Sequence, residues 1–255
     1  MSSYRVDKQF LIGAQIPQET RTYKPVSHQE IIDLTYEMCE QSGFTIESET
    51  YNATEKGLVA NGKYLISNVT DSEMKLELGW QNSYNKTKKL KYAIGVRVLV
   101  CNNGCVSGDM GSFGKKHRGD IQEFAPIKIS EYIKSSGDVF QMMVKEREML
   151  KSVEINPRVR AELIGRMFIE ETFVQSTQLN VIAKEIANPT HDYKAPNTMW
   201  ELYNYTTFAM KEIHPSLWME NHIDAHRWFV NEAGTLAGTT TSIMVPTPVI
   251  EMANF

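Results

Sequence analysis

Hydrophobic and polar positions along the chain follow a helical period first, then a strand period, and then a helical period again. The first helical stretch has apolar residues at helical spacing from Ile31 onward. Before it, Ser27 and Glu30 form the pattern of a capping box. Gly43 stands where this helix is expected to end. The sequence therefore predicts one helix over about 27–42, ahead of the main strands.

Residues 44–54 have the look of a strand. Apolar and polar residues then alternate over 73–84 and over 91–100, which is the pattern of strands with one buried face. In the last of them Tyr92 and Val96 share one face, whereas Lys91 and Arg97 share the other. Each segment is therefore expected to turn one side towards a core.

Turn signals join these strands into a meander. Asn61-Gly62 is the strongest short hairpin signal, so we expect residues 57–61 to pair with residues 63–70. Asn102-Asn103-Gly104 predicts a further turn, after which residues 105–109 run back. Together these signals predict an antiparallel meander of about five strands.

From residue 126 the apolar positions return to a helical period. The expected helices are one around 139–153, one beginning at Pro157 after the cap Asn156, one over 177–187, one from Thr198 to Ile213, and one from Ser216 to Asn231. Residues 110–125 have the composition of a Gly-rich, basic loop. This order predicts an α+β fold, with one helix before the meander and a helical C-terminal half after it.

The same order suggests how the chain is divided. Residues 1–125 are expected to hold the N-terminal helix and the antiparallel sheet with its basic loops. Residues 126–233 are expected to form a helical region packed on that sheet, as one domain with it. Residues 234–255 form a C-terminal tail without a helical period.

Charge is distributed unevenly over this pattern. The window 86–118 holds eight basic residues and the single acid Asp109, a formal charge of +7 in a chain whose net charge is −4. A basic feature on an acidic body is typical of proteins that meet phosphate. The alternative is that the window forms two solvated loops that happen to be basic.

A surface that combines cations with aromatic rings is what sequence-neutral binding of a single strand requires. We expect such a nucleic-acid-binding surface here, and it requires the loops on either side of the 91–100 strand to converge in space. Its candidate residues are the cations Lys86, Lys88, Lys89, Lys91, Arg97, Lys115, Lys116 and Arg118 and the aromatic residues Trp80, Tyr84 and Phe113.

Other sequence patterns give weaker indications of a phosphate-binding loop or a metal site. Glycines precede Lys115 and Lys116, but their spacing departs from that of a phosphate-binding loop. Cys101 and Cys105 have a spacing that zinc can use, with His117 as a third ligand, but no fourth ligand stands at an expected distance.

The pair His222 and His226 lies on one face of a predicted helix and is a second candidate for metal binding. In the zinc-protease pattern a glutamate follows the first histidine, and Ile223 stands there instead. The sequence therefore predicts no metal and no cofactor, and it leaves the catalytic residues, if any, unidentified.

Composition bears on the compartment. The chain is 42% hydrophobic and 23% charged, as in ordinary globular proteins. No stretch approaches the roughly 18 apolar residues of a membrane span, and the N-terminal sequence MSSYRVDKQF lacks the apolar core of a signal peptide. Three cysteines give no disulfide framework. We expect a cytoplasmic protein without a membrane partner.

Two parts of the chain resemble the DUF932 family of phage- and plasmid-encoded proteins of unknown function. Residues 96–104 and 117–121 are similar to the family's "R-V-V-C-x-N" strand and "H-T-G-N" segment, with Arg118 in place of Thr and Asp120 in place of Asn. Residues 197–206 resemble its "N-T-x-W-x-x-Y-N-A-x-T-E" helix. The resemblance spans about 90–210 and implies a mobile-element origin, without an established activity.

Within that helix the sequence departs at Tyr205, which replaces a small residue, and at Phe208, which breaks the Thr-Glu ending. Trp200, Tyr203 and Asn204 form an aromatic stripe with one amide. Such a stripe is expected to act as a structural clamp.

The leading hypothesis is a phage- or plasmid-type accessory protein of DNA metabolism in the cytoplasm, the host's cytoplasm if it is phage-encoded. It would bind single-stranded nucleic acid, DNA rather than RNA, as a homo-oligomer. A meander followed by a long helix resembles the core of Rad52-like annealing proteins at the level of fold.

Two alternatives belong to other classes. One is an enzyme acting on a nucleotide or nucleic acid, with His117, Asp109 and Asp120 around a metal or phosphate. The other is an interaction protein that inhibits or scaffolds a host complex, for which the thirteen methionines and the apolar segment 243–250 would serve in docking.

Overall fold

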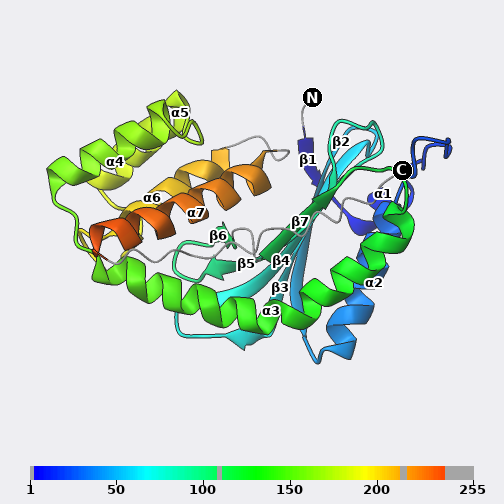
Figure 1. Cartoon of the computed structure of the whole chain (residues 1–255), viewed down its shortest axis with the longest axis horizontal. Coiled ribbons are helices and arrows are strands. Elements are labelled where there is room, and N and C mark those ends of the chain that lie inside the picture. Colours follow the sequence, from blue (N-terminus) through cyan, green and yellow to red (C-terminus); the bar gives the residue numbers. More distant parts are fainter. Residues whose placement is uncertain (1–2, 108–110, 213–216, 239–255) are drawn as a thin grey trace, which may run out of the picture.

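The computed structural model describes residues 3–107, 111–212 and 217–238. Its elements are, in chain order, β1 (Ser3–Val6), α1 (Lys8–Ile12), α2 (His28–Gln41), β2 (Ile46–Thr54), β3 (Val59–Thr70), β4 (Met74–Ser83), β5 (Leu90–Val98), β6 (Asn103–Val106), β7 (Ser112–Lys115), α3 (Ile121–Ser152), α4 (Pro157–Ile169), α5 (Ser176–Ala187), α6 (Met199–Ala209), the short 3₁₀ helix η2 (Met210–Glu212) and α7 (Trp218–Leu236). A helix precedes the meander and helices follow it, so the predicted α+β order is confirmed (Figure 1).

The sheet has seven strands and is antiparallel throughout. Strands β1 to β6 are neighbours in chain order, and β7 pairs with β5. One edge of β5 carries two short strands end to end, because β6 pairs with residues 95–98 and β7 pairs with residues 90–93. β1 and β7 are the strands that the sequence pattern did not indicate.

One face of the sheet packs against α2 and α3, and the large aromatic side chains of the core lie there. Trp80 and Tyr92 are fully buried. The Trp80 ring stacks on that of His28 in α2, and the Tyr92 hydroxyl lies 3.2 Å from Thr35 Oγ1 in the same helix. The apolar face predicted for β4 and β5 is therefore buried, and burial of each such side chain contributes about 1.5–3 kcal/mol. The expectation that only one face is buried is wrong, because Glu77, Gln81 and Ala93 on the other face are buried as well, where Trp218 of α7 covers the sheet.

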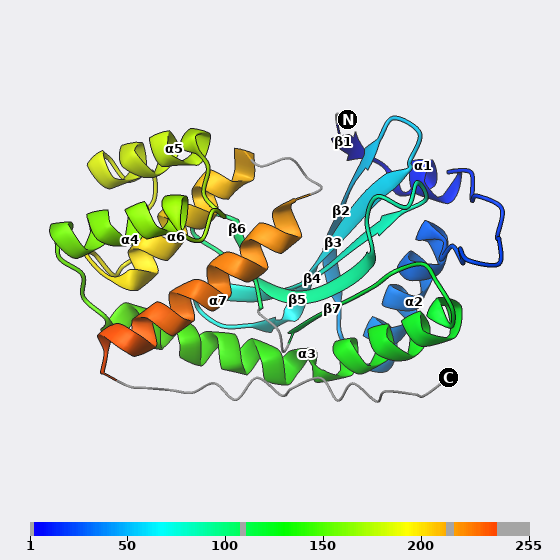
Figure 2. The ribbon, with the colours of Figure 1, turned by 45° about the horizontal axis from the view of Figure 1, so that its top comes forward.

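Helix α3 joins the sheet to the helical part of the molecule. Its 32 residues span about 48 Å, and Figure 2 shows it running beneath both parts. Towards its start Tyr132 donates to the carbonyl of Ser112 in β7, at 2.9 Å, and towards its end Glu146 pairs with His226 of α7, at 3.0 Å. Among the residues that the structure describes, no helix is long and apolar enough to cross a membrane.

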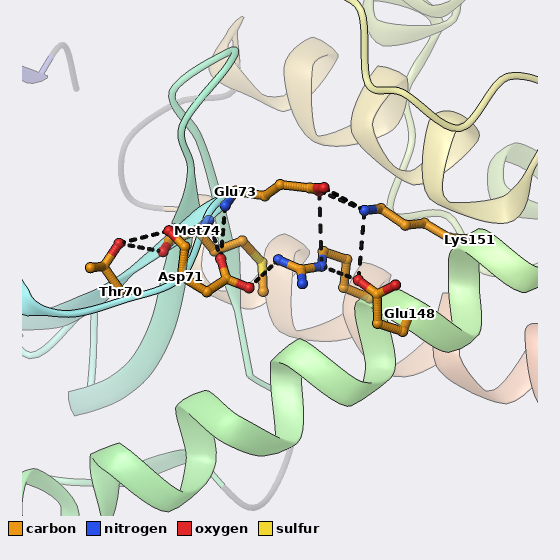
Figure 3. A network of polar contacts seen from close by, with 7 residues as sticks. Thr70, Asp71, Glu73, Met74, Glu148 and Lys151 are labelled. Carbon is orange, nitrogen blue, oxygen red and sulfur yellow. Dashed lines mark hydrogen bonds and ion pairs between the residues drawn. The ribbon is translucent and has the colours of Figure 1, made fainter.

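The end of α3 also holds the turn between β3 and β4 through ion pairs (Figure 3). Arg147 donates to Asp71 at 2.5 Å, and Lys151 donates to both carboxylate oxygens of Glu73 at 2.7 Å. Asp71 in turn accepts from the backbone amides of Glu73 and Met74, at 2.9 and 2.7 Å. The turn is thus fixed to the helix by a network in which Arg147 is buried.

Strand β6 is tied to α6 by buried side chains. Asn103 Nδ2 donates to the carbonyl of Asn204 at 3.0 Å and to Thr207 Oγ1 at 3.2 Å, and Cys101 Sγ lies 3.9 Å from Asn204 Oδ1. Both asparagines are fully buried. These contacts agree with the structural role expected of Asn204, and they join two of the segments that carried the family resemblance.

The predicted hairpin at Asn61-Gly62 is wrong, because both residues lie inside the continuous strand β3. The chain turns at residues 55–58 instead, where Gly57 has φ +65°. Gly62 lies opposite Trp80, and a Cβ there would come within 2.5 Å of the indole nitrogen. The glycine makes room for a neighbouring ring and does not mark a turn.

Other boundaries also differ from expectation. The turn after β5 falls at residues 99–102, so Asn103 and Gly104 already belong to β6. The stretch 110–125, expected as a loop, contains β7 and the first turn of α3. Helix α7 continues past Asn231 into the predicted tail and ends at Leu236, while Ser216, Ile213 and residues 239–255 lie outside the described residues.

Candidate anion-binding surface

The two basic loops that flank β5 converge on one hollow of about 350 Å³, which we call the basic hollow. It is lined by Thr22, Tyr23, Lys86, Thr87, Lys88, Lys89, Lys116, His117 and Arg118. Five of these side chains are cationic, and the lining includes no carboxylate. The structure thus brings together five of the eight predicted cations.

Strand pairing explains the convergence. β4 ends at Ser83 and β5 begins at Leu90, so the loop with the first three lysines leads into β5. β7 runs antiparallel to β5, with Lys115 opposite Leu90. Because the end of β7 lies beside the beginning of β5, the loop before β5 and the segment after β7 emerge at the same edge of the sheet.

Local hydrogen bonds hold the first loop in place. Asn85 Oδ1 accepts from the backbone amide of Thr87 at 3.2 Å and from its hydroxyl at 2.6 Å. The Ser83 hydroxyl donates to the carbonyl of Lys88 and accepts from its amide, at 2.8 and 3.0 Å. Lys86 has φ +65° and places its ammonium group 4.7 Å from the centre of the Tyr23 ring.

The floor of the basic hollow is uncharged. His117 is 4% exposed, and its ring lies 5.8 Å from that of Tyr23. Burial lowers the pKa of His117, and a backbone contact with Lys24 acts in the opposite direction. Neither ring nitrogen has a hydrogen-bond partner of ordinary geometry. A neutral imidazole keeps one N–H donor, so the hollow combines five cationic side chains with a buried polar group.

Two of the predicted cations point elsewhere and are already paired. Lys91 donates to Glu220 of α7 at 2.5 Å. Lys115 donates to Asp120 at 2.6 Å and lies 3.8 Å from the centre of the Phe124 ring. Glu220 also stands 4.0 Å from Lys88, so this carboxylate lies at the border of the basic hollow.

Arg97 lies away from the basic hollow. It is six residues from Lys91 along β5, which is about 20 Å. It pairs with the buried carboxylate of Glu77, which also lies 3.9 Å from Lys63. The Lys63 ammonium group sits 3.9 Å from the centre of the Trp218 ring, and burial lowers its pKa while Glu77 raises it. Arg97 therefore belongs to a separate polar cluster under α7.

Two of the three aromatic residues predicted to stack on bases, Trp80 and Tyr84, are buried, so the prediction is wrong for these two. Trp80 is fully buried in the core, and Tyr84 is 4% exposed, with its hydroxyl accepting from the backbone amide of His28 at 2.8 Å. Neither ring has a face open to a base, because the alternation that places them in or beside β4 also turns them towards α2. Phe113 is partly exposed, although it packs against Tyr132.

A second hollow, of about 360 Å³, adjoins the first, and we call it the mixed hollow. It is lined by Lys89, Lys91, Ser112, Phe113, Gly114, Met219, Glu220, Ile223, Asp224 and Arg227. It shares Lys89 with the basic hollow. Residues from α7 form one side of it, and no local pattern in the sequence indicates that this helix reaches the basic loops.

The residues considered for metal binding are dispersed. Cys101 and Cys105 are buried beside α6, whereas His117 lies in the basic hollow. On α7, His226 Nδ1 lies 3.0 Å from the Tyr203 hydroxyl, while burial lowers the pKa of His222 to about 3. Within the described residues, no group of three His, Cys, Asp or Glu side chains could hold a metal ion.

Three lining residues of the basic hollow were missed by sequence reasoning: Thr22, Tyr23 and Thr87. Thr22 and Tyr23 come from the segment before α2, more than sixty positions away from the lysines. Tyr23 is placed by a hydrogen bond from its hydroxyl to the carbonyl of Tyr84, at 3.0 Å. A contact of this kind between distant segments has no local signature in the sequence.

Comparison with known proteins identifies a family for this fold. Residues 18–222 match the family described as "Domain of unknown function (DUF932)". No curated protein and no solved structure matches the chain. The matched region includes strands β2 to β7, the basic hollow and the chain from α2 to the start of α7, so it covers residues 96–104, 117–121 and 197–206, on which the resemblance was based. The chain belongs to the DUF932 family.

Proposed function

We propose that this protein binds single-stranded nucleic acid through the basic hollow. The observation that supports the proposal is the meeting of five cationic side chains, from two separate loops, in a hollow without a lining carboxylate. Cations arranged in this way neutralise successive phosphates and release the counterions condensed on a nucleic-acid strand. The acidic remainder of the chain limits contacts elsewhere.

The shape of the surface favours a single strand over a duplex. A flexible single strand can fit its phosphate backbone into a concave site, whereas a rigid duplex has a convex surface and contacts only the edge of the hollow. The lysines at the rim have long flexible side chains that can follow a backbone without reading its sequence. The proposal therefore includes a preference for the single strand.

The proposed role is that of an accessory protein of phage or plasmid DNA metabolism, acting on DNA rather than RNA. A long helix lying across an antiparallel meander is also the arrangement in Rad52-like annealing proteins, which is an analogy of fold alone. The proposal includes assembly into a homo-oligomer. Light scattering of the purified protein measures that state directly.

Fluorescence anisotropy with a labelled single strand, across a salt series, tests the proposal. Five phosphate contacts give a slope of log K against log salt of about −3.5, at about −0.7 for each contact. Lys89→Glu combined with Lys116→Glu removes one cation from each loop, and the slope should shrink to about −2 with much weaker binding.

The matched control is Lys145→Glu, on an exposed position of α3 away from both hollows. This variant should bind as the wild type does. Absence of binding at low salt, or an equal loss in the control, would overturn the proposal. A duplex of the same sequence that binds as tightly as the single strand would remove the single-strand preference.

A free nucleotide is the second candidate ligand. The size of the basic hollow and the neutral His117 at its floor favour it, since small-molecule sites have volumes of about 300–1,000 Å³. The length of the ligand separates the two candidates. If affinity rises from a mononucleotide to a strand of about ten nucleotides, the strand is the ligand, because further phosphates reach further cations.

A further inference from the structure

The two adjoining hollows differ in their chemistry. The basic hollow is lined by cations and by no carboxylate, whereas the mixed hollow includes Glu220 and Asp224. These acids lie four residues apart on α7 and therefore on one face of the helix. The mixed hollow also includes Lys89, Lys91 and Arg227, but its two carboxylates repel phosphate, so it suits a phosphate less well than the basic hollow does.

Part of the lining of the mixed hollow suits a flat, uncharged group. Phe113 of β7 and Ile223 of α7 are partly exposed and provide apolar surface from two different elements. At the border, Lys89 lines both hollows. A group that enters the mixed hollow would thus be next to a phosphate held in the basic hollow.

Building on the proposed function, we infer that the mixed hollow receives a base of the bound strand and selects bases that carry an exocyclic amino group. A carboxylate can only accept hydrogen bonds. Cytosine and adenine carry an exocyclic amino group that can donate a hydrogen bond, whereas uracil and thymine have none. Cytosine has this group at C4, where uracil and thymine have a carbonyl oxygen. Asp and Glu are the side chains that accept from cytosine N4.

Both carboxylates take part in ion pairs, and a carboxylate offers about four lone-pair sites at which it can accept hydrogen bonds. Glu220 binds Lys91 through one oxygen, and its other oxygen lies 4.0 Å from Lys88. Asp224 lies 3.6 Å from Arg227, and its side chain is 56% exposed. Burial acts to raise the pKa of Glu220, but the hydrogen bond from Lys91 and the nearby lysines outweigh it, so the pKa of Glu220 is lowered.

The test compares oligonucleotides of deoxycytidine and deoxyuridine, of about twenty residues each, by anisotropy at one salt concentration. The two strands have equal charge and length and differ at C4, which carries an amino group in cytosine and a carbonyl oxygen in uracil, and in the protonation of N3. Wild-type protein is expected to bind the cytidine strand about threefold to tenfold more tightly. In Glu220→Gln combined with Asp224→Asn this ratio should fall close to one, because an amide can also donate to the uracil oxygen.

The control pair Glu162→Gln with Glu171→Gln removes the same charge from exposed positions on and after α4. It should keep the cytidine preference of the wild type. Circular dichroism checks that each variant is folded, and Asp224→Asn alone repeats the test if the double variant does not fold. Its ratio should also move towards one.

The outcomes separate this inference from the function on which it rests. Equal binding of both strands by the wild type, with a normal salt slope, overturns the base-selecting role and leaves the proposed function standing. A preference that persists unchanged in the carboxylate variants overturns it as well. If neither strand binds, the proposed function itself fails.

Discussion

His28, the first residue of α2, is fully buried against the sheet, and its surroundings favour the neutral form. Its Nε2 lies 2.8 Å from the carbonyl of Gly57, and its Nδ1 lies 3.1 Å from Asn82 Nδ2. The carbonyl can only accept, so Nε2 carries the proton and Nδ1 receives a hydrogen bond from the amide. Burial lowers the pKa of His28 to about 4, against the opposing effect of the bond to Gly57.

This histidine makes the stability of the protein depend on pH. The pKa is lower in the folded state than the usual value of about 6.5, so the unfolded chain binds more protons between about pH 6.5 and pH 4. The free energy of unfolding therefore falls as pH falls through that window, by about 2 kcal/mol at pH 5 from His28 alone. His222, with its pKa lowered to about 3 by burial, acts in the same direction.

Urea unfolding at about pH 7.5 and about pH 5 measures the effect. His28→Gln cannot titrate, so its loss of stability between the two pH values should be smaller than that of the wild type by about 2 kcal/mol. The comparison is between pH differences, so a general destabilisation of the variant does not disturb it. An equal pH dependence in both proteins would contradict this account of His28.

Gly62 tests the interpretation of the Asn-Gly pair. A Cβ at this position would lie 2.5 Å from Trp80 Nε1 and 2.9 Å from Tyr51, and both rings are buried. We expect Gly62→Ala to destabilise the protein by about 1–3 kcal/mol, as overpacking in a core does. Gly137→Ala in α3 meets no atom within 4 Å and should stabilise the helix by about 0.5–1 kcal/mol. Thermal melting of both variants measures these changes in stability. An unchanged melting temperature for Gly62→Ala would refute the packing argument.

At the scale of elements, the contact between the β3–β4 turn and α3 depends on Arg147. Its side chain is 7% exposed, and it pairs with Asp71 and Glu148. Arg147→Met keeps the apolar stem but removes the cation that pairs with Asp71 and Glu148, so Asp71 keeps only its backbone amide donors and Glu148 only Lys151. The loss should be about 2 kcal/mol, less than the 3–5 kcal/mol typical of a fully buried pair, because the Asp71 side chain is 24% exposed.

Chemical denaturation of Arg147→Met measures this loss. Lys145→Met is the matched control, since Lys145 is an exposed cation two positions earlier on the same helix. It should change the free energy of unfolding by less than about 0.5 kcal/mol, as surface substitutions usually do. If the two variants lose equal stability, the network in Figure 3 does not stabilise the turn.

At the scale of the whole molecule, the sheet and the helices share a core. The buried cluster runs from Leu11 of α1 through Trp80 of the sheet to Phe229 of α7. α3 contributes to it along its length and contacts β5 as well as α6 and α7. We therefore expect the two regions predicted from the sequence, 1–125 and 126–233, to unfold together.

Differential scanning calorimetry tests this expectation. A single transition, with calorimetric and van't Hoff enthalpies in agreement, is the result expected of one cooperative unit. Two separable transitions would show that the helical region unfolds on its own. In that case the contacts between α3 and the sheet would be too weak to couple the two parts.

Much of the fold could be predicted because its signals are local. Ser27 caps α2 by accepting from the amide of Glu30, and Asn156 caps α4 in the same way. The alternation in β4 and β5 identified two central strands and one of the two buried faces of each. β7 was not foreseen, because its four residues, Ser-Phe-Gly-Lys, are too few to show a period.

The candidate site could be predicted only in part. The cationic residues were recognisable by composition, but their grouping was not. Arg97 and Lys91 share a strand face, yet one pairs with Glu77 and the other with Glu220, and only the fold brings those partners to them. Trp80 and Tyr84 carry rings suited to stacking, and burial against α2 removes both from the surface.

By itself the sequence determined the order of helices and strands, the helix caps, the face of each central strand and the uneven charge, since each depends on residues near one another in the chain. The tertiary structure alone decided which loops meet. The pairing of β7 with β5 brings Lys116 and Arg118 beside Lys86, Lys88 and Lys89, and the return of α7 places two carboxylates next to them. Such contacts depend on strand pairing and packing between distant segments, and no local period encodes them.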